Sequence, residues 1–423
     1  MHPLSWEELE QAAAGHPALD AGQRIDGVCN SPATLRLFGQ SASAVRVTLF
    51  RDHHAWCPYC QKVWLWLEER RIPYRIRKVT MVCYGEKEPW YRRLVPSGML
   101  PAVEIDGRLI TDSDSILQTL ESSFGSLGVG LMAPESRPLR QLERLLFRSW
   151  CQWLCQPHRP ASESTARLQF QRCATAMEEA LCASGGPFLL GTAISSVDVV
   201  AVPFLERMNA SLAYYKGSLL RQEHPAIDQW LAALERRTSY LGTQSDFHTH
   251  VHDLPPQLGG CYANGTASQC QLASQIDAGP WPIRGNNDAD QETSQPQPVD
   301  AATWALARVL RHRTTLLQRN PIGADQFDPA LRTALSGLIQ GTTLPPPATT
   351  ARGLRHLRDR ICAPRDMPLH AARLLRTALE ATARCDPELP EGQGAALPTK
   401  HRHDQDPKPF LNSVHRDEAV QNR

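Results

Sequence analysis

Two cysteines that stand two residues apart, Cys57 and Cys60, follow an apolar strand pattern at 45–50 and precede a helical pattern. Apolar and polar residues alternate through 45–50, and from Tyr59 onward the apolar residues recur at helical spacing. A cysteine pair between a strand and a helix is typical of a redox site. Pro58 suits a first helical turn because it has no N–H group to lose there.

The position at the start of a helix predicts different roles for the two cysteines. The unpaired backbone N–H groups and the dipole of a helix N-terminus favour an anion, so we expect Cys57 to be an exposed, activated thiolate. Cys60, one turn into the helix, is placed to resolve a mixed disulfide on Cys57. His53 and His54 precede the pair; a histidinium there would stabilise the thiolate further, and the alternative is an exposed loop histidine.

Composition narrows the functional classes. The 423-residue chain is long enough for two or three domains, and its net charge of +1 gives no overall field toward a nucleic acid or a membrane. The N-terminus is acidic and lacks the apolar core of a signal peptide, and no apolar run approaches the roughly 18 residues of a membrane span. Of the twelve cysteines, only Cys57 and Cys60 have redox or zinc spacing. Without a second C-x-x-C or a histidine pair nearby, we expect no metal site, and we expect a cytoplasmic protein.

Periodicity and composition divide the chain into six segments. They are an N-terminal extension (1–44, with a capping-box pattern at Ser5 and Glu8), an α/β domain (45–125), an all-helical domain (135–250), a linker (251–300), an extra helical domain (301–385) and a disordered tail (386–423). Within the α/β domain we expect further strands at 74–79, 102–105 and 108–110 and a helix at 113–124. Asp106-Gly107 between two strands predicts a hairpin.

Four motifs around the cysteine pair resemble those of the glutathione transferase family. The loop 96–101 resembles the one that places a cis-proline beside the active site, and 110–116 resembles the family's acidic-Ser signature. Lys87 aligns with a lysine that holds the glycine carboxylate of glutathione, and Ser195-x-x-Asp198 matches a buried capping box. The resemblance implies catalytic roles for Cys57 and Cys60, and glutathione contacts for Trp56, Pro58, Tyr59, Lys87, Leu100, Pro101, Asp112 and Ser113. The alternatives are a surface charge at Lys87 and an ordinary helix cap at Asp112.

The identity of the catalytic residue implies a subgroup and a reaction. Cysteine at position 57 is similar to the cysteine types (omega, lambda and iota), and the C-P-Y-C form with an extra domain is most similar to the iota class. The implied fold is a thioredoxin-like N-terminal domain and an all-α C-terminal domain, followed by a mainly helical domain. The implied activity is that of a glutathione-dependent thiol transferase or deglutathionylase, which forms an S-glutathionylated Cys57. Dehydroascorbate or a glutathionyl-quinone is then a candidate substrate.

The partners follow from the same resemblance. Glutathione is the expected co-substrate, with a small hydrophobic or disulfide substrate, and a homodimer stays open. Two alternatives remain: a non-catalytic redox module that binds a ligand or a partner, and a carrier of an iron–sulfur cluster ligated by glutathione and Cys57.

Several other residues invite competing interpretations. Cys83 is expected to be structural, or less readily a distal redox partner. Cys151 and Cys155, one helical turn apart, are expected to be buried small residues. His248, His250 and His252 alternate, so an extended segment would place them on one side, either as a metal site or within a polar linker.

Two larger groups concern the helical regions. The aromatic residues Trp150, Trp153, Tyr214 and Tyr215 are expected either in the core or in the wall of a substrate pocket. The arginines of 352–384 are expected to form a solvated helix face or a protein-docking surface, with Arg352, Arg355 and Arg358 together. No aromatic residues are interleaved with them, which argues against RNA binding.

Overall fold

The computed structural model describes residues 2–19, 26–27, 31–157 and 160–387. Its contacts divide the chain into two compact units. The central unit comprises 22–274 and 282–295, and the terminal unit comprises 1–21, 275–281 and 296–423. Apart from its first two residues, the predicted tail at 386–423 lies outside the described residues.

A five-stranded sheet begins the central unit. Its strands are β1 (Leu35–Arg36), β2 (Val47–Asp52), β3 (Tyr74–Val79), β4 (Ala102–Ile105) and β5 (Arg108–Thr111), in the order β1-β3-β2-β4-β5. Strand β2 pairs in parallel with β3 and antiparallel with β4, so that Leu49 lies between Ile76 and Val103. The predicted strands at 74–79 and 102–105 are confirmed, whereas the two-residue β1 is too short to show a period.

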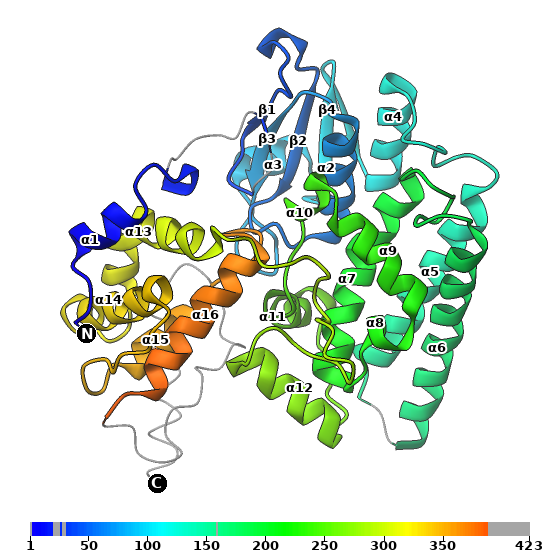
Figure 1. Cartoon of the computed structure of the whole chain (residues 1–423). Coiled ribbons are helices and arrows are strands. Elements are labelled where there is room, and N and C mark those ends of the chain that lie inside the picture. Colours follow the sequence, from blue (N-terminus) through cyan, green and yellow to red (C-terminus); the bar gives the residue numbers. More distant parts are fainter. Residues whose placement is uncertain (1, 20–25, 28–30, 158–159, 388–423) are drawn as a thin grey trace. The chain divides into compact units, whose positions relative to one another are not determined.

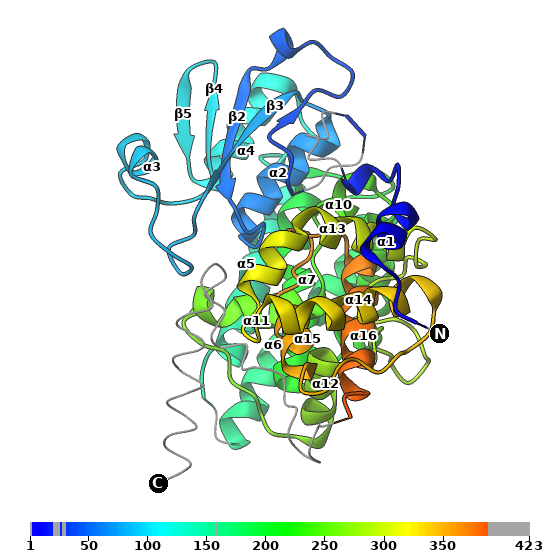
Figure 2. The same ribbon diagram turned by 90° about the vertical axis from the view of Figure 1, so that its left-hand side faces the viewer.

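Helices cover both faces of this sheet. Figure 2 shows α3 (Pro89–Leu94) on one face and α2 (Pro58–Arg70) and α4 (Ser113–Phe124) on the other. On the α3 face a small core is formed by Phe50, Val79, Tyr91, Val95 and Ala102. Helix α2 contacts α4 and also α7 of the helical domain. The helix that follows the cysteine pair is therefore enclosed between the sheet and the helical domain.

The rest of the central unit is helical (Figure 1). Its helices are α5 (Ser136–Leu154), α6 (Pro160–Ala183), α7 (Ser196–Lys216), α8 (Leu220–Glu223), α9 (Pro225–Glu235), α10 (Thr238–Leu241), α11 (Phe247–Leu258) and α12 (Ala267–Ala278), the last of which continues into residues of the terminal unit. Almost every residue of α7 is buried, and its capping box of Ser195 and Asp198 is confirmed. A sheet domain with an all-helical domain after it is thus present, as predicted.

The segment around the three histidines differs from the prediction. Residues 247–258 form α11, so His248, His250 and His252 do not share one side of an extended chain. Asp246 caps this helix by accepting the Thr249 N–H, at 2.9 Å. Apolar residues at 247, 251 and 254 then supply a buried helical stripe. Helix α12 likewise lies within the stretch that composition marks as a linker.

The terminal unit is a helical assembly with its own core. It contains α1 (Trp6–Ala12), α13 (Ala301–Arg319), α14 (Ala324–Gln340), α15 (Ala351–Arg358) and α16 (Leu369–Arg384). The Ser5–Glu8 capping box is present, and Leu9 and Ala13 are fully buried in the same core as α13 to α16. The start of the predicted extension therefore packs with helices some 300 residues later in the chain.

Arg352 and Arg384 are exposed, but the other arginines of α15 and α16 are buried and do not form a solvated face. Arg355 and Arg358 are buried, and both bond to the carboxylate of Glu380, as does Arg384. Burial alone would raise the pKa of Glu380, but its bonds to Arg355 and the charge of Arg358 hold that pKa below its ordinary value. Of the three arginines predicted to lie together, Arg355 and Arg358 therefore meet at a buried acid, whereas Arg352 is exposed.

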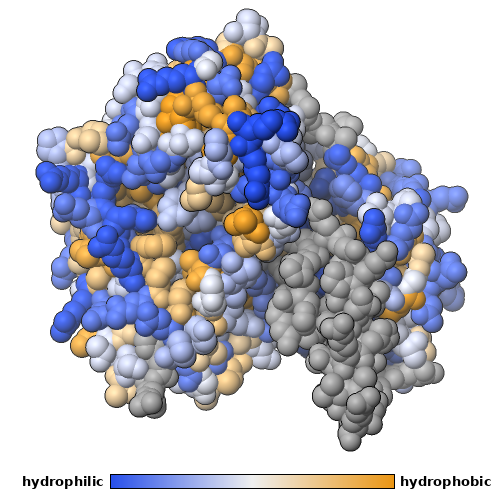
Figure 3. All heavy atoms as spheres, turned by 180° about the vertical axis from the view of Figure 1, so that it is seen from behind, coloured by the Kyte–Doolittle hydropathy of each residue, from blue (hydrophilic) through white to orange (hydrophobic). Residues whose placement is uncertain are grey.

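The surface shown in Figure 3 mixes hydrophilic residues with small hydrophobic patches. Among the described residues, no helix combines the length and apolar character needed to cross a membrane.

Candidate active site

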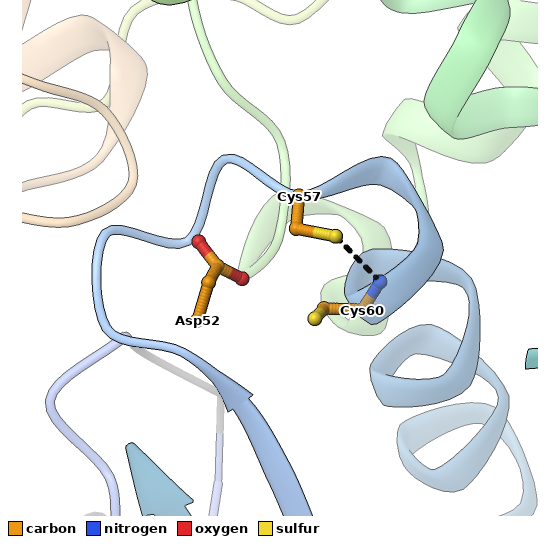
Figure 4. A group of neighbouring side chains, drawn as sticks. All are labelled: Asp52, Cys57 and Cys60. Carbon is orange, nitrogen blue, oxygen red and sulfur yellow. Dashed lines mark hydrogen bonds between the residues drawn. The ribbon is translucent and has the colours of Figure 1, made fainter. Parts of the chain in front are cut away.

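The cysteine pair lies at the carboxyl end of β2, where the chain turns into α2. Asp52, the last residue of β2, accepts the backbone N–H of Trp56 at 2.6 Å and so closes the turn. Cys57 is the N-cap of α2, and its sulfur accepts the backbone N–H of Cys60 at 3.4 Å (Figure 4). Pro58 occupies the first helical position, as the sequence predicts. The sulfur of Cys57 is thus directed at the helix N-terminus, where a negative charge is stabilised.

Both cysteines are buried, which corrects the expectation that Cys57 is exposed. Cys57 is 6% exposed and Cys60 is 1% exposed. The physical reason is that α7 of the helical domain packs on α2. Burial, followed by the hydrogen bond to Cys57, raises the pKa of Cys60 well above its ordinary value. Cys60 is therefore held as a neutral thiol.

A carboxylate joins the pair. An oxygen of Asp52 and the sulfurs of Cys57 and Cys60 all lie within 4.8 Å of one another (Figure 4). Oδ2 of Asp52 accepts the Trp56 N–H, whereas Oδ1 is buried and has no hydrogen-bond partner within the described part of the chain. The group could accept a proton from Cys60, and it could hold a metal ion through one oxygen and two sulfurs. Sequence reasoning missed Asp52, although its place at the end of the strand before the cysteines was a usable signal.

The helical domain holds the cysteine loop through a buried arginine. Arg207 of α7 donates to the carbonyl of Trp56 at 2.7 Å and to the side chain of Gln61 at 2.8 Å. The same guanidinium lies 3.0 Å from the carboxylate of Glu206, which also accepts from Gln61 and Tyr240. Burial alone would raise the pKa of Glu206, but its interactions with His250, then with Arg207 and Tyr240, lower it. Arg207 therefore fixes both sides of Cys57.

The surroundings of the histidines near the cysteine pair differ from the prediction. His54 is buried, and its ring lies 4.7 Å from the ring of Trp56 and 4.8 Å from that of Tyr84. His250 of α11 lies 3.3 Å from Glu206, and burial lowers its pKa. Trp56 itself is fully buried, so its side chain packs within the protein. Cys83 is half-buried, and burial raises its pKa to about 11, which favours the structural interpretation.

The predicted loop before β4 has the expected backbone. The Leu100–Pro101 peptide is cis, and Tyr91 donates its hydroxyl to the carbonyl of Met99 at 2.6 Å. Lys87 donates to the carbonyl of Thr80 at 2.9 Å, and burial lowers its pKa. The ammonium of Lys87 therefore has a hydrogen-bond acceptor within the chain, and the residue is partly exposed to solvent.

Three predicted residues meet at one cavity. Tyr59, Asp112 and Ser113 line a cavity of about 670 Å³ between α2, α4 and α5. Asp112 is the N-cap of α4 and accepts the Ser115 N–H at 3.0 Å, so the cap interpretation is correct. Its φ of 71° is unusual for a residue with a side chain. The α4 N-terminus thus presents its first backbone N–H groups toward this cavity.

Sequence reasoning missed the cationic wall of the cavity. Five lining side chains are cationic: Lys62, Arg137, Arg140, Arg144 and Arg148. The signal was available, because the four arginines recur every three or four residues along α5.

Only part of this positive charge is neutralised. The carboxylate of Asp114 lies 2.6 Å from Lys62 and 2.9 Å from Arg140, and Glu143 pairs with Arg144. Burial raises the pKa of Glu143 in spite of that partner. The wall therefore suits an anionic group.

The aromatic residues of the helical domain do not line this cavity. Trp150 and Trp153 are each 1% exposed, and their ring N–H groups donate to Ser211 and Glu163. Tyr215 donates its hydroxyl to the carbonyl of Val251 at 2.7 Å. Of the two interpretations offered by the sequence, core packing is the correct one for the tryptophans.

Two family models match the central unit. One is the glutathione S-transferase N-terminal domain, at residues 56–123, and the other is the glutathione S-transferase C-terminal domain, at residues 138–233. The sheet domain is therefore the thioredoxin-like N-terminal domain of this fold, and the following helices are its all-α C-terminal domain. The helices beyond about residue 240 are additional.

Relatives of the transferase family cover about half of the chain. "Glutathione S-transferase DHAR3, chloroplastic" from Arabidopsis thaliana is 26% identical over 48% of this chain and 75% of its own length. "Glutathione S-transferase L3" from the same plant is 25% identical over 45% of this chain and 79% of its own length. Among solved structures, glutathione transferase Omega 3C from Trametes versicolor is 24% identical over 51% of this chain and 91% of that chain, with a TM-score of 0.43.

Proposed function

We propose that the central unit is a glutathione-dependent thiol transferase in which Cys57 is the nucleophile. The observation that carries this proposal is the sulfur of Cys57 at the N-cap of α2, where it accepts the Cys60 N–H. This position stabilises a thiolate, which is the reactive form of cysteine. The match to both transferase domains supports glutathione as the co-substrate.

The reaction consists of two thiol–disulfide exchanges. The Cys57 thiolate attacks the glutathione sulfur of a mixed disulfide, a bond forms between these two sulfurs, and the substrate leaves as a thiolate. The thiolate of a second glutathione then attacks the same glutathione sulfur. Oxidised glutathione leaves, and Cys57 is regenerated as a thiolate. In sum, one free glutathione reduces the mixed disulfide, and the products are the substrate thiol and oxidised glutathione.

Cys60 is a poor resolving thiol in this scheme. Its pKa is raised by burial, so it must lose a proton before it can attack Cys57. Asp52, whose carboxylate lies within 4.8 Å of both sulfurs, is the group placed to take that proton. The route that uses a single cysteine is therefore favoured, and Cys60 serves mainly to hold the thiolate by hydrogen bonding.

Glutathione would lie along the loops around Cys57. Its γ-glutamyl end would bind at Asp112 and Ser113, where α4 begins. Its cysteinyl part would meet the backbone of Leu100 beside the cis Pro101, and Lys87 is the cation proposed for its glycine carboxylate. Trp56, Pro58 and Tyr59 complete the predicted set, and Tyr59 reaches the cavity directly.

The second substrate is proposed to carry negative charge. The arginines of α5 extend the cavity beyond Asp112, and a small apolar molecule would leave them unsatisfied. A glutathionylated or other anionic disulfide suits this wall better than a hydrophobic electrophile. Dehydroascorbate and glutathionyl-quinones stay candidate substrates, the first in line with relatives named DHAR. The iota-class assignment and the cytoplasmic location stay predictions.

The test is the glutathione-dependent reduction of an S-glutathionylated peptide. The wild-type protein should turn the peptide over and, in the absence of free glutathione, should carry one glutathionyl group on Cys57 by mass spectrometry. Cys57→Ser should lose at least about 10³-fold in turnover, because the nucleophile is absent. Cys182→Ser, an exposed thiol on α6, is the matched control and should leave turnover unchanged. Full turnover in Cys57→Ser would exclude the proposal.

The same purified protein discriminates the two alternatives. An absorption band of the anaerobically purified protein that disappears in Cys57→Ser would favour the iron–sulfur carrier. Absence of turnover in a wild-type protein that still binds glutathione would favour the non-catalytic module.

A further inference from the structure

A second group of cysteines lies at the far end of α5. Cys151 and Cys155 are one turn apart, and the N–H of Cys155, the C-cap, donates to the carbonyl of Cys151 at 2.8 Å. Cys261 comes to them from a segment more than a hundred residues later, because the N–H of Tyr262 donates to the carbonyl of Leu154 at 2.9 Å. We call Cys151, Cys155 and Cys261 the second thiol group, and Cys57 with Cys60 the first.

The segment that carries Cys261 is fixed by more than this one bond. The N–H of Asn264 donates to the carbonyl of Tyr215 at 3.0 Å, and its side-chain amide donates to the carbonyl of Lys216 at 3.0 Å. The segment is thereby attached to the C-terminal ends of both α5 and α7. The approach of Cys261 to Cys155 is thus built from backbone hydrogen bonds.

The sulfur of Cys155 is the acceptor in this group. Hydrogen bonding with the thiol of Cys151 and then with that of Cys261, together with the charge of Lys216, outweighs burial and lowers the pKa of Cys155. The pKa values of Cys151 and Cys261 are raised, because the hydrogen bond of each thiol to Cys155 favours its protonated form and burial does the same. Lys216 is held in place by Glu163, whose carboxylate lies 3.3 Å away.

All three cysteines are partly exposed, so reagents can reach them. This corrects the expectation that Cys151 and Cys155 are buried small residues. A partly exposed thiolate with a neighbouring thiol is the arrangement of a redox-sensitive cysteine and its resolving partner.

We propose that Cys155 is a second redox-modification site, which reacts with glutathione disulfide and is then resolved by Cys261. In the first step the Cys155 thiolate attacks one sulfur of glutathione disulfide and releases a glutathione thiolate. The first step removes the Cys155 thiolate, whose hydrogen bond is the main cause of the raised pKa of Cys261. In the second step Cys261 therefore loses its proton to solvent and attacks the sulfur of Cys155, which releases the second glutathione. The products are a Cys155–Cys261 disulfide and two reduced glutathiones, so electrons and atoms balance.

Cys261 is the expected partner in preference to Cys151. On a helix the Cβ atoms of residues four apart lie about 5–6 Å apart, beyond the roughly 3.5–4.5 Å that a disulfide needs, and the helix cannot adjust this separation. Cys261 lies in a non-helical segment that can adjust by a small movement. The disulfide would covalently attach this segment to the end of α5.

The test uses the full chain with Cys57→Ser, so that the first thiol group cannot supply the exchange and the outcome is independent of the proposed function. The protein is incubated with glutathione disulfide, alkylated and analysed by peptide mass spectrometry. We expect a peptide pair linked through Cys155 and Cys261. Adding Cys261→Ser should leave a stable glutathionyl group on Cys155, and adding Cys155→Ser should give neither product.

A measurement on the wild-type chain protects the test against misfolded variants. Cys155 should be alkylated at least about 10-fold faster than Cys182 and Cys270, two exposed thiols without such neighbours among the described residues. Reaction of Cys155 at the same rate as these two, or a linked pair that lacks Cys155, would overturn the proposal.

Discussion

The two thiol groups of the central unit lie at opposite ends of helices. Cys57 caps the N-terminus of α2, where free N–H groups point at its sulfur, whereas Cys155 caps the C-terminus of α5, where free carbonyl groups oppose a negative charge. At the second position the donors must come from elsewhere, and they come from two thiols and Lys216. A thiolate can therefore be supported at either end of a helix, provided that donors replace the missing N–H groups.

The two thiol groups also differ in their exposure to solvent. The first is almost completely buried and is held by charges of the helical domain, while the second is partly open. A buried thiolate selects the substrate that its surroundings can bind, and an open one meets small oxidants directly. We expect a specific reaction at the first group and a general response to the thiol redox state at the second.

The largest effect is expected from breaking the buried Arg207–Glu206 ion pair, which holds the loop of the first thiol group. Arg207→Met leaves the carboxylate of Glu206 buried without its main cation, and breaking such a pair costs about 3–5 kcal/mol of stability. Chemical denaturation measures this loss, and turnover should fall because the carbonyl of Trp56 loses its donor. Glu163→Gln, which removes the partner of Lys216 at the second group, is the comparison.

The control should cost less, about 1–3 kcal/mol, because the amide oxygen introduced at position 163 can still accept a hydrogen bond from the buried Lys216, although the charge of the 19%-exposed Glu163 is lost. The double variant Glu206→Gln/Arg207→Met should recover part of the loss, because no charge is then left unpaired. Equal costs for Arg207→Met and Glu163→Gln would show that the two groups are supported alike.

The next prediction concerns pH at the second group. Its neighbouring thiols and Lys216 lower the pKa of Cys155 from 9.0 to about 4. Because the folded-state pKa is the lower one, this thiolate contributes stability that is present above the unfolded pKa and is lost as pH falls through the folded pKa. Between the folded and the unfolded pKa of Cys155, its alkylation rate should stay nearly constant as the pH is lowered. The rate of an ordinary thiol falls about tenfold for each pH unit over the same range.

Alkylation of Cys155 and Cys182 in the same sample provides the ratio directly. The ratio should rise about 100-fold as the pH is lowered by about two units below neutrality. A constant ratio would mean that the thiols of Cys151 and Cys261 do not stabilise the thiolate.

Removing charges from the cationic wall should have a smaller effect, and this effect should be confined to the reaction at the first thiol group. Arg137→Gln with Arg148→Gln removes two charges from the cavity beside the first group. We expect KM for an anionic glutathionylated peptide to rise about tenfold with little change in kcat, because the lost interactions favour binding. Glutathionylation of Cys155 by glutathione disulfide should not change. If the variant also slowed the glutathionylation of Cys155, the substitutions would have disturbed α5 as a whole.

The sequence predicted the parts of the site that lie close together along the chain. The strand before Cys57, the Pro58 helix start and the cap at Asp112 follow from local period and turn chemistry, and the structure contains all three. Arg207 and Cys261 could not be found in this way, because they reach their partners across about 100 to 150 residues. Their contacts depend on how helices pack, which single-sequence periodicity does not encode.

The smallest expected effect concerns the inner cysteine of the first group. Cys60→Ser keeps the backbone N–H that Cys57 accepts, and turnover should stay within about threefold of the wild type, since Cys60 is held as a neutral thiol. Cys261→Ser at the second group should instead trap the glutathionyl adduct on Cys155. The contrast follows from access, because Cys60 is almost fully buried and Cys261 is partly exposed. A loss above about 10-fold in Cys60→Ser, with glutathione trapped on Cys57, would show that both groups use a resolving thiol.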